Sequence, residues 1–398
     1  MSNNLWRNSR FTYFLASMTI NNFGDWFDVF ALQIIFAYEF SASPIIMGML
    51  AFLYFIPAIL LGPVAGVVAD RYSKRNIMMV TDILSAVLTL GLLLSHSIGL
   101  ALLLILIRSS ISSLNFPTQQ SYVKQIVSDE KLLEASSYTA ISHQLAKIFG
   151  PVLGSVILLV APARACLGVN AISFILSFLI LLTLPADKPI PTKELQNNLK
   201  GWVSDVKSGG VFVWRHLLLR IVTALTIVWL FCNIVFLSQL TVFLKHILPG
   251  EPRVLGYVLG LEGLGAVLTG AILSRYKSIS NYAYYFFAAF CLIGVGTLGI
   301  GCYQTSWLRF FLYISPFILG LGGGIGMVVQ GYLIRKESPE KQLGCVFGIS
   351  SATQNISLAV GTLLGGVLVM QFGTREVYIG LAVTMLLLGI SAFLLLRK

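Results

Sequence analysis

Long hydrophobic runs alternate with short polar connections along most of the chain. An α-helix of about 20 apolar residues spans the ~30 Å hydrocarbon core of a bilayer. This pattern predicts an all-α membrane protein with twelve transmembrane helices, at residues 11–38, 44–69, 76–95, 99–123, 135–160, 164–185, 219–244, 254–274, 280–301, 306–334, 343–371 and 375–396.

One long polar stretch, 186–215, separates the sixth run from the seventh. It predicts an N-terminal six-helix half (1–185), a cytoplasmic linker (186–218) and a C-terminal six-helix half (219–398). Apolar residues recur at helical spacing inside the linker, which predicts a short amphipathic helix on the membrane surface; a disordered linker is the alternative. These residues are Leu199, Trp202, Val203 and Val206.

The two sets of six runs also share sequence. Three short matches occur in the same order and at nearly the same offset: 66–72 with 270–276, 120–122 with 330–332, and 150–156 with 361–367. Each match alone is weak, because glycine-rich helices resemble one another. Together they predict duplicated halves related by an axis along the membrane normal.

Composition supports a membrane protein, since 57% of the 398 residues are hydrophobic and 11% are charged, against about 25% charged residues in soluble domains. The net charge of +11 does not indicate nucleic acid, because the cations lie mostly in the connections. They concentrate on the side of the N-terminus. Positive loops face the cytoplasm, so both termini are predicted to be cytoplasmic. The opposite side carries Arg164, Lys245, Arg253, Arg309 and Arg375.

Enzyme chemistry has no signal in the sequence. There is no Walker motif, hydrolase triad or metal-ligand cluster, and the glycine-rich stretch 320–326 lacks the spacing and lysine of a phosphate loop. The five scattered cysteines predict neither a disulfide framework nor a metal site. The first ten residues are polar and basic, and a long apolar run without a clear cleavage site follows, which predicts an uncleaved first helix and no signal peptide. We therefore expect a protein that is not an enzyme and has no cofactor or metal.

Ionisable residues inside apolar helices are the candidate functional groups, because a charge near the bilayer centre must face the protein interior or a wet cavity. Asp25 and Asp28 are three residues apart, which predicts that they share one face of the first helix. Two carboxylates in one low-dielectric site favour retention of a proton by one of them. The alternative is a helix that breaks near 21–24 and leaves both acids at the outer interface.

Other helices carry further candidates. Arg108 requires a carboxylate, and Asp25 or Asp28 lies at a similar depth; the pair would serve coupling or only hold two helices together. Lys147 is expected to be buried, where it neutralises an acid or binds an anionic group of a substrate. His143 is expected to be a hydrogen-bonded interior residue, and Glu262 to bind a cationic substrate or a proton. Asp82 is expected to contact the loop cations.

The connection between the second and third runs resembles the signature loop of the major facilitator superfamily. It reads Gly-x-x-x-Asp-Arg-x-x-Lys-Arg, with Ser73 where the family usually has glycine; its residues are Gly66, Asp70, Arg71, Lys74 and Arg75. The resemblance implies that Asp70 contacts the inner end of the eleventh helix and latches the halves, while the three cations anchor the loop.

Two further resemblances concern coupling and direction. The position of Arg108 resembles a fourth-helix arginine linked to proton coupling in that family, although the surrounding glycines are absent. Gly150-Pro151-x-x-Gly154 resembles the antiporter motif of its exporters. Ile148 and Gln144 stand where further glycines are usual. Close packing of this bent helix against its repeat partner would seal one face against leak.

The resemblance covers the whole chain. Within the superfamily, the chain is most similar to bacterial drug, macrolide-efflux and siderophore-export proton antiporters. This resemblance implies a monomeric multi-pass protein of the bacterial cytoplasmic (inner) membrane. Such a protein exports an amphipathic organic compound by alternating access, driven by the proton gradient. Its partners would be a small or lipid-like molecule, protons and membrane lipids. Aromatic candidates for the cavity wall are Trp26, Tyr54, Phe55, Trp229 and Phe231.

Two alternatives stay open from the sequence. One is a translocator of lysophospholipids or related lipids, since long apolar helices with few buried charges suit that function as well. The other is a transporter-like receptor that does not transport and needs no titrating acid.

Overall fold

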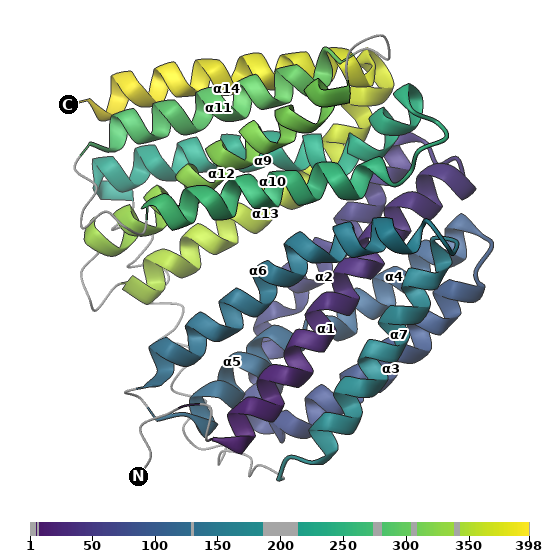
Figure 1. Ribbon diagram of the computed structural model, residues 1–398. Helices are drawn as coiled ribbons and strands as arrows, with labels where there is room; N and C mark the ends of the chain where they lie inside the picture. Colours follow the sequence, from purple (N-terminus) through teal and green to yellow (C-terminus); the bar gives the residue numbers. More distant parts are fainter. Residues whose placement is uncertain are drawn as a thin grey trace. The chain divides into compact units, whose positions relative to one another are not determined.

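The computed structural model describes residues 5, 8–128, 131–185, 214–273, 281–303, 309–337 and 343–397 (Figure 1). All elements in this part of the chain are helices. They are α1 (Ser9–Ile34), the π-helical turn η2 (Ile35–Glu39), α2 (Pro44–Arg71), α3 (Lys74–Leu94), α4 (Ile98–Ser112), α5 (Asn115–Ile126), α6 (Leu132–Ile157), α7 (Arg164–Leu182), α9 (Leu217–Ile247), α10 (Val254–Leu273), α11 (Tyr282–Gly301), α12 (Arg309–Glu337), α13 (Leu343–Phe372) and α14 (Thr374–Leu396).

The predicted all-α membrane fold is confirmed, and ten spans are long and apolar enough to cross a membrane within the described residues. Two of the twelve expected segments, α1 and α6, fall outside that set. Both carry several polar side chains in the membrane-length region, among them Asp25 and Asp28 on α1 and His143 and Lys147 on α6. These two helices thus carry several of the candidate functional groups, and other candidates lie on the ten spans.

The fourth expected segment is broken into α4 and α5, with a turn at 113–114. Pro117 has no N–H to bond the carbonyl of Ser113, and its ring crowds that carbonyl. The chain instead closes the turn with the N–H of Leu114 bonded to the carbonyl of Ile111 at 3.1 Å. The sequence prediction of one continuous helix over 99–123 is thus wrong at this point.

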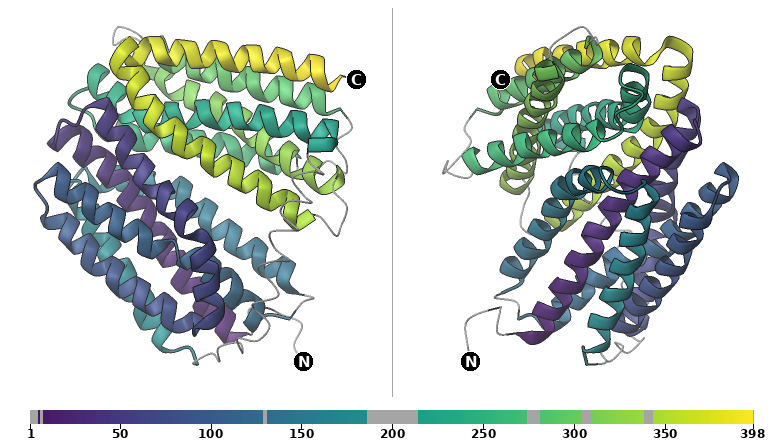
Figure 2. Two further views of the ribbon diagram at one scale, coloured as in Figure 1. Left: turned by 180° about the vertical axis from the view of Figure 1, so that it is seen from behind. Right: turned by 45° about the vertical axis from the view of Figure 1, so that its right-hand side comes forward.

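The chain forms two compact units: 1–41 with 53–193, and 42–52 with 194–398. In the first unit, α1 packs against α6 and α7, and α3 against α4 and α7 (Figures 1 and 2). In the second, α9 packs against α13 and α14, and α11 against α12 and α14. Each pair of the first unit recurs between the helices of equivalent order in the second, as duplicated halves require.

The start of α2 belongs to the second unit rather than to the first. Gln239 of α9 donates a hydrogen bond from Nε2 to the carbonyl of Pro44 at 3.1 Å. Gly366 of α13 lets the backbone of Ile45 approach so closely that an added Cβ would lie 2.8 Å from its Cα. The predicted boundaries at 185 and 219 do not anticipate this contribution of 42–52.

In both units, glycines allow close packing at the same helix crossing. On α6, an added Cβ at Gly150 would lie 2.5 Å from Cβ of Trp26, and one at Gly154 would lie 2.6 Å from the ring of Phe30. On α13, an added Cβ at Gly361 would lie 3.2 Å from the carbonyl of Phe231 of α9. Gly365 likewise faces Val235 of α9. The expectation that Gly150 and Gly154 face the repeat partner of their helix is wrong, because they face α1.

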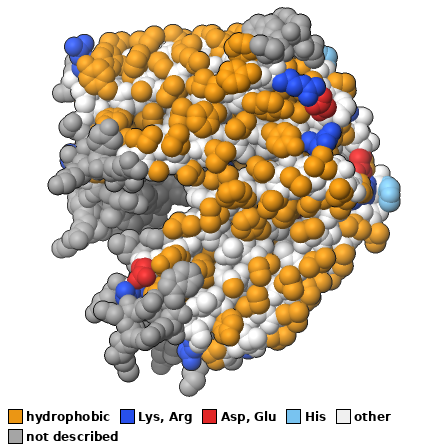
Figure 3. Space-filling view, in the orientation of Figure 1, with side chains coloured by type: hydrophobic (Ala, Val, Ile, Leu, Met, Phe, Trp, Pro, Cys, Tyr) orange, Lys and Arg blue, Asp and Glu red, His pale blue; other side chains and the backbone are white. Residues whose placement is uncertain are grey.

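Hydrophobic side chains spread over the face seen in Figure 3, and charged ones lie mainly near its margins. Many large apolar side chains are exposed along helices that are long enough to cross a membrane. Such exposure is expected where lipid tails replace water as the solvent.

The close packing at Gly150 predicts a stability difference. Gly150→Ala should destabilise the protein by about 1–3 kcal/mol, since the new methyl group forces α1 and α6 apart. Gly323→Ala is the matched control, because Gly323 lies within α12 and nothing stands within 4 Å of its added Cβ. Thermal unfolding in detergent measures both. Equal melting temperatures for the two variants would contradict the close packing of α6 on α1 at Gly150.

Candidate functional site

Four helices of the first unit each contribute one polar side chain to a buried cluster. These are Asp28 from α1, Tyr54 from α2, Thr89 from α3 and Arg108 from α4; we call them the Arg108 cluster. Asp28 is 1% and Arg108 4% exposed. A charged side chain on a membrane helix must find its partners on neighbouring helices, and here all four helices meet at the guanidinium.

The guanidinium binds the carboxylate in a bidentate manner. Arg108 Nη1 donates to Asp28 Oδ1 at 2.6 Å, and Nη2 donates to Asp28 Oδ2. Nη1 also donates to the Thr89 hydroxyl at 3.1 Å, and Nη2 to the Tyr54 hydroxyl at 3.3 Å. The Tyr54 hydroxyl in turn donates to Asp28 Oδ2 at 2.8 Å. The carboxylate therefore accepts three hydrogen bonds, two of them from a cation.

This arrangement makes the pair neutral as a unit but costly to break. Removing one partner of a buried ion pair leaves an uncompensated charge, which costs about 3–5 kcal/mol. A proton on Asp28 would likewise release the guanidinium from its ionic partner. The cluster can thus serve as a fixed clamp between helices or as a switch with two charge states.

Asp25 lies one turn before Asp28 on α1, but its surroundings are different. Its side chain is exposed, whereas that of Asp28 is buried. The charges of Arg108, Asp28 and Asp82 act on Asp25 electrostatically. The two acids therefore interact through their charges, as their spacing predicts, but neighbouring helices cover Asp28 and leave Asp25 exposed.

A second group gathers around Trp26, the residue after Asp25. The Lys147 ammonium of α6 lies 6.0 Å from the centre of the Trp26 ring, and the His143 ring meets that ring edge-on at 6.3 Å between centres. His143 and Lys147 are both exposed. The expectations of a buried Lys147 and an interior His143 are wrong, since their face of α6 is not covered by the helices of its own unit.

The remaining candidates do not join these groups. Trp229 of α9 is buried against Phe290 and Gly326, which indicates packing rather than a cavity wall. Glu262 of α10 is half-buried in the second unit, where its backbone lies against Gly320 of α12. Tyr54 lies in the Arg108 cluster.

The signature loop is described only in part: the surroundings of Gly66 and the side chains of Asp70 and Arg71 are not described. The linker with its predicted amphipathic helix lies outside the described residues. Lys74 is buried at the start of α3. Arg75 donates to the carbonyls of Leu181 at 2.8 Å and Leu182 at 2.9 Å. A cation there satisfies the last carbonyls of α7 and complements its dipole.

Asp82 and Thr89 show what the sequence reading missed. Asp82 is 1% exposed and accepts hydrogen bonds from Asn21 and Ser177, rather than contacting loop cations as expected. It belongs to a buried polar stripe on α3 that the sequence analysis does not predict. The stripe repeats at helical spacing through an apolar helix, a signal that could have found it: Thr81, Asp82, Ser85 and Thr89.

Comparison with known families identifies the fold. The model of the Major Facilitator Superfamily matches residues 11–308 and 250–398. The crystal structure of the nucleoside transporter NupG has a TM-score of 0.76 with this chain, at 13% identity, and the match covers 98% of this chain and 99% of NupG. At that identity the likeness shows the fold alone.

Three curated relatives match most of the chain. The uncharacterised MFS-type transporter YfiS of Bacillus subtilis (strain 168) is 27% identical over 379 residues, 94% of this chain and 90% of YfiS. The multidrug efflux pump Tap of Mycolicibacterium fortuitum is 26% identical over 371 residues, 86% of this chain and 85% of Tap. Macrolide efflux protein A of Streptococcus pyogenes is 17% identical over 344 residues, 85% of this chain and 84% of that protein.

The Arg108 cluster predicts strong coupling between its two charges. Asp28→Asn and Arg108→Gln should each lower the free energy of unfolding by about 3–5 kcal/mol, because each leaves the other charge unpaired. The double variant should lose much less than the sum. Tyr54→Phe should cost about 1.5–3 kcal/mol through its bond to a carboxylate.

Denaturant unfolding in detergent measures this cycle. Tyr13→Phe is the control for Tyr54→Phe, since Tyr13 is 50% exposed. If the losses of the two charge variants simply add, Asp28 and Arg108 are not coupled in the folded protein.

Proposed function

We propose that this chain, which belongs to the major facilitator superfamily of membrane transporters, exports an amphipathic organic compound in exchange for protons. The observation that carries the proposal is the contrast between two acids one turn apart on α1. Asp28 is held by Arg108, and Asp25 is exposed beside it. A fixed charge pair next to an accessible acid is a suitable arrangement for exchanging protons.

The direction of transport rests on relatives and on a motif. Tap and macrolide efflux protein A are efflux proteins by name. The Gly150-Pro151-x-x-Gly154 sequence resembles the exporters' motif, although the packing of these glycines recurs in the second unit and therefore has a structural reason as well. Both favour export over uptake.

The proposed coupling step takes place at Asp25. A proton from water binds the Asp25 carboxylate, forms a neutral carboxylic acid and removes one negative charge from the surroundings of Arg108. The loss of this charge changes the electrostatic potential at the Arg108–Asp28 pair. The charge state of Asp25 therefore biases the packing of α1 against its neighbours. Release of the proton on the other side of the membrane restores the carboxylate, and the two units alternate in access.

The proposed substrate surface lies next to this acid. Trp26 offers an aromatic face, and the exposed ammonium of Lys147 offers a cation beside it. An amphipathic compound with an apolar or aromatic part and an anionic group fits these two features. We place the protein in the bacterial cytoplasmic membrane as a monomer with both termini in the cytoplasm, as the distribution of loop cations favours.

Proteoliposomes with an imposed pH gradient and a trapped pH dye test this function. In the wild type, one class among macrolides, siderophores and lysolipids should accelerate the collapse of the gradient. Asp25→Asn should abolish this proton flux, because the amide cannot take up a proton, but retain exchange of labelled compound against unlabelled compound. Lys147→Gln should weaken binding of an anionic compound by about tenfold or more, the equivalent of ~1.4 kcal/mol.

Glu376→Gln serves as the control, because Glu376 is an exposed acid at the start of α14. Full proton flux in Asp25→Asn would contradict the proposed coupling. Movement of labelled lysolipid without any proton flux would instead identify a lipid translocator.

A further inference from the structure

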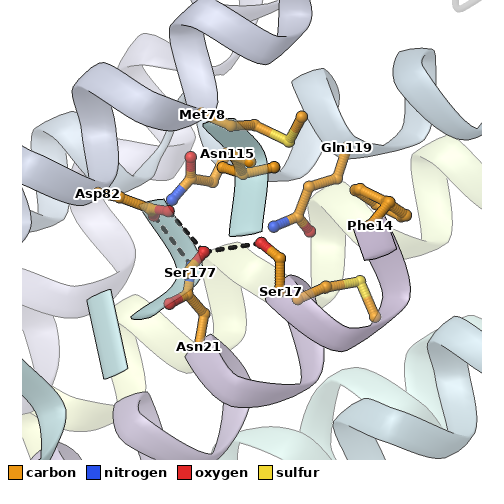
Figure 4. Close-up of a pocket in the computed structure, with 10 residues that line it drawn as sticks. Phe14, Ser17, Asn21, Met78, Asp82, Asn115, Gln119 and Ser177 are labelled. Atoms are coloured by element: carbon orange, nitrogen blue, oxygen red, sulfur yellow. Dashed lines mark hydrogen bonds between the residues drawn. The ribbon is translucent and has the colours of Figure 1, made fainter. Parts of the chain in front are cut away.

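A second polar site lies inside the first unit, away from the surface that carries Asp25. It is a small cavity with room for about one water-sized body. Four helices line it: α1, α3, α5 and α7. Figure 4 shows how their side chains converge, with Asp82, Asn21, Ser17 and Ser177 joined by hydrogen bonds and Asn115 and Gln119 beside them.

The hydrogen bonds of this site are directed at one carboxylate. Ser177 donates to Asp82 Oδ2 at 2.6 Å, and Asn21 Nδ2 donates to Asp82 Oδ1 at 2.9 Å. Because the Ser177 proton goes to Asp82, the 2.7 Å contact between the Ser17 and Ser177 hydroxyls has Ser17 as donor. Neutral groups thus solvate a buried carboxylate, in a chain of donors that ends on its oxygens.

The charge of Asp82 is not paired with a cation among the described residues. The other side chains that line the cavity from α1, α5 and α7 are neutral. Along the helices that line the cavity, the nearest charged residues in sequence lie on α3, α5 and α1. They are Lys74 and Arg75, two turns before Asp82, Lys124, five residues after Gln119, and Asp25, one turn after Asn21. Arg75 is engaged with the carbonyls at the end of α7. A carboxylate without a cation in a membrane helix is costly, and such residues mark ion or proton sites.

An unused acceptor lies in the same site. Asn21 is 8% exposed, and its Oδ1 is buried without a hydrogen-bond partner. Its amide nitrogen already donates to both Asp82 and Ser177. A buried oxygen without a donor is disfavoured, so the site lacks one electropositive partner that would satisfy Asn21 and neutralise Asp82 together.

Helix packing does not require this polar set. The equivalent helix pair of the second unit, α11 with α14, has apolar side chains and glycines at its contacts. Gly294 of α11 lies against Leu386 of α14, and Gly389 of α14 lies against Phe290 of α11. The duplicated fold therefore accommodates an apolar interface at this pair. The polar residues of α1, α3 and α7 need a different reason.

We propose that Asp82, Asn21, Ser17 and Ser177 form a binding site for one monovalent cation, a proton or Na⁺, which we call the Asp82 site. The inference deepens the proposed function, since it adds a second cation-binding group to the one at Asp25. For Na⁺, the ligands are oxygens: the carboxylate, Asn21 Oδ1 and the two hydroxyls, which suit a hard cation. For a proton, hydronium transfers H⁺ to Asp82 Oδ1 and leaves water, and the Asn21 amide rotates so that its oxygen accepts the new O–H.

Two binding measurements on the purified protein in detergent test the site without any transport. Equilibrium dialysis with radioactive Na⁺ at neutral pH measures bound Na⁺. Acidification of a weakly buffered sample from about pH 9 to pH 5.5 measures bound protons, above the range near pH 4 in which exposed carboxylates titrate. The wild type should bind one Na⁺, or take up one more proton than Asp82→Asn.

Matched variants make the result specific. Glu376→Gln, an exposed acid of the second unit, should match the wild type in both measurements. Ser177→Ala keeps the carboxylate and should fold even if Asp82→Asn does not. Since Ser177 stabilises the charged form, its loss should raise the pH midpoint of proton uptake by about one unit, or weaken Na⁺ binding about tenfold.

The outcomes separate this inference from the proposed function. Loss of Na⁺ binding in Asp82→Asn identifies a sodium site, and loss of one proton alone identifies a proton site. Unchanged Na⁺ and proton binding in Asp82→Asn overturns the inference, as does unchanged cation binding in Ser177→Ala where Asp82→Asn does not fold. Asp82-dependent binding in a protein whose wild type shows no proton flux would retain the site and reject proton-coupled export.

Discussion

The pairing of Arg108 with Asp28 is the constraint on which the first unit depends. A guanidinium in an apolar helix has no water to solvate it, so its donors must be met by neighbouring helices. α1 supplies the carboxylate, while α2 and α3 supply hydroxyls at 3.3 and 3.1 Å. This requirement fixes which face of α1 turns inward, and it explains why α1 is too polar to qualify as a simple span.

Duplication explains why the two units have the same helix arrangement, and the side chains that differ between them carry the candidate functional groups. Gly150 and Gly154 seat α6 on α1, and Gly361 and Gly365 seat α13 on α9 in the same manner. The helix pairs of the two units also correspond. The buried polar sets around Arg108 and Asp82, however, belong to the first unit. Where α3 has a polar stripe, α11 has phenylalanine and alanine. A common scaffold thus carries buried charged and polar clusters in the first unit, and these clusters are the groups that we propose to bind cations.

Much of the fold follows from hydrophobic run length, because a span must satisfy its backbone within itself. The break at 113–114 was missed, although Pro117 is visible in the sequence, since the helix was placed from the length of the run and not from its proline and the polar residues around it. Site prediction named candidate residues but not their surroundings. Spacing alone placed Asp25 and Asp28 together, whereas the covering helices bury one and expose the other. The same covering leaves Lys147 exposed. Tertiary packing decides which side of a helix is covered by its neighbours. A single sequence shows only the periodicity of polar and apolar residues along that helix.

Three acids of the first unit occupy three different surroundings, and the surroundings decide what each can do. Asp28 binds the Arg108 guanidinium in a bidentate manner, so its charge is compensated. Removal of the Asp28 carboxylate is therefore expected to lower stability before it affects any other property. Asp25 is exposed, which suits the proposed exchange of protons. Asp82 is as buried as Asp28 but accepts hydrogen bonds from one hydroxyl and one amide, which is the basis for proposing that it binds a small cation. The charges of Arg108, Asp28 and Asp82 all act on Asp25. If the Asp82 site binds a cation as proposed, the potential at Asp25 becomes less negative and the ionised form of Asp25 is favoured, so the two proposed sites would be linked through charge alone.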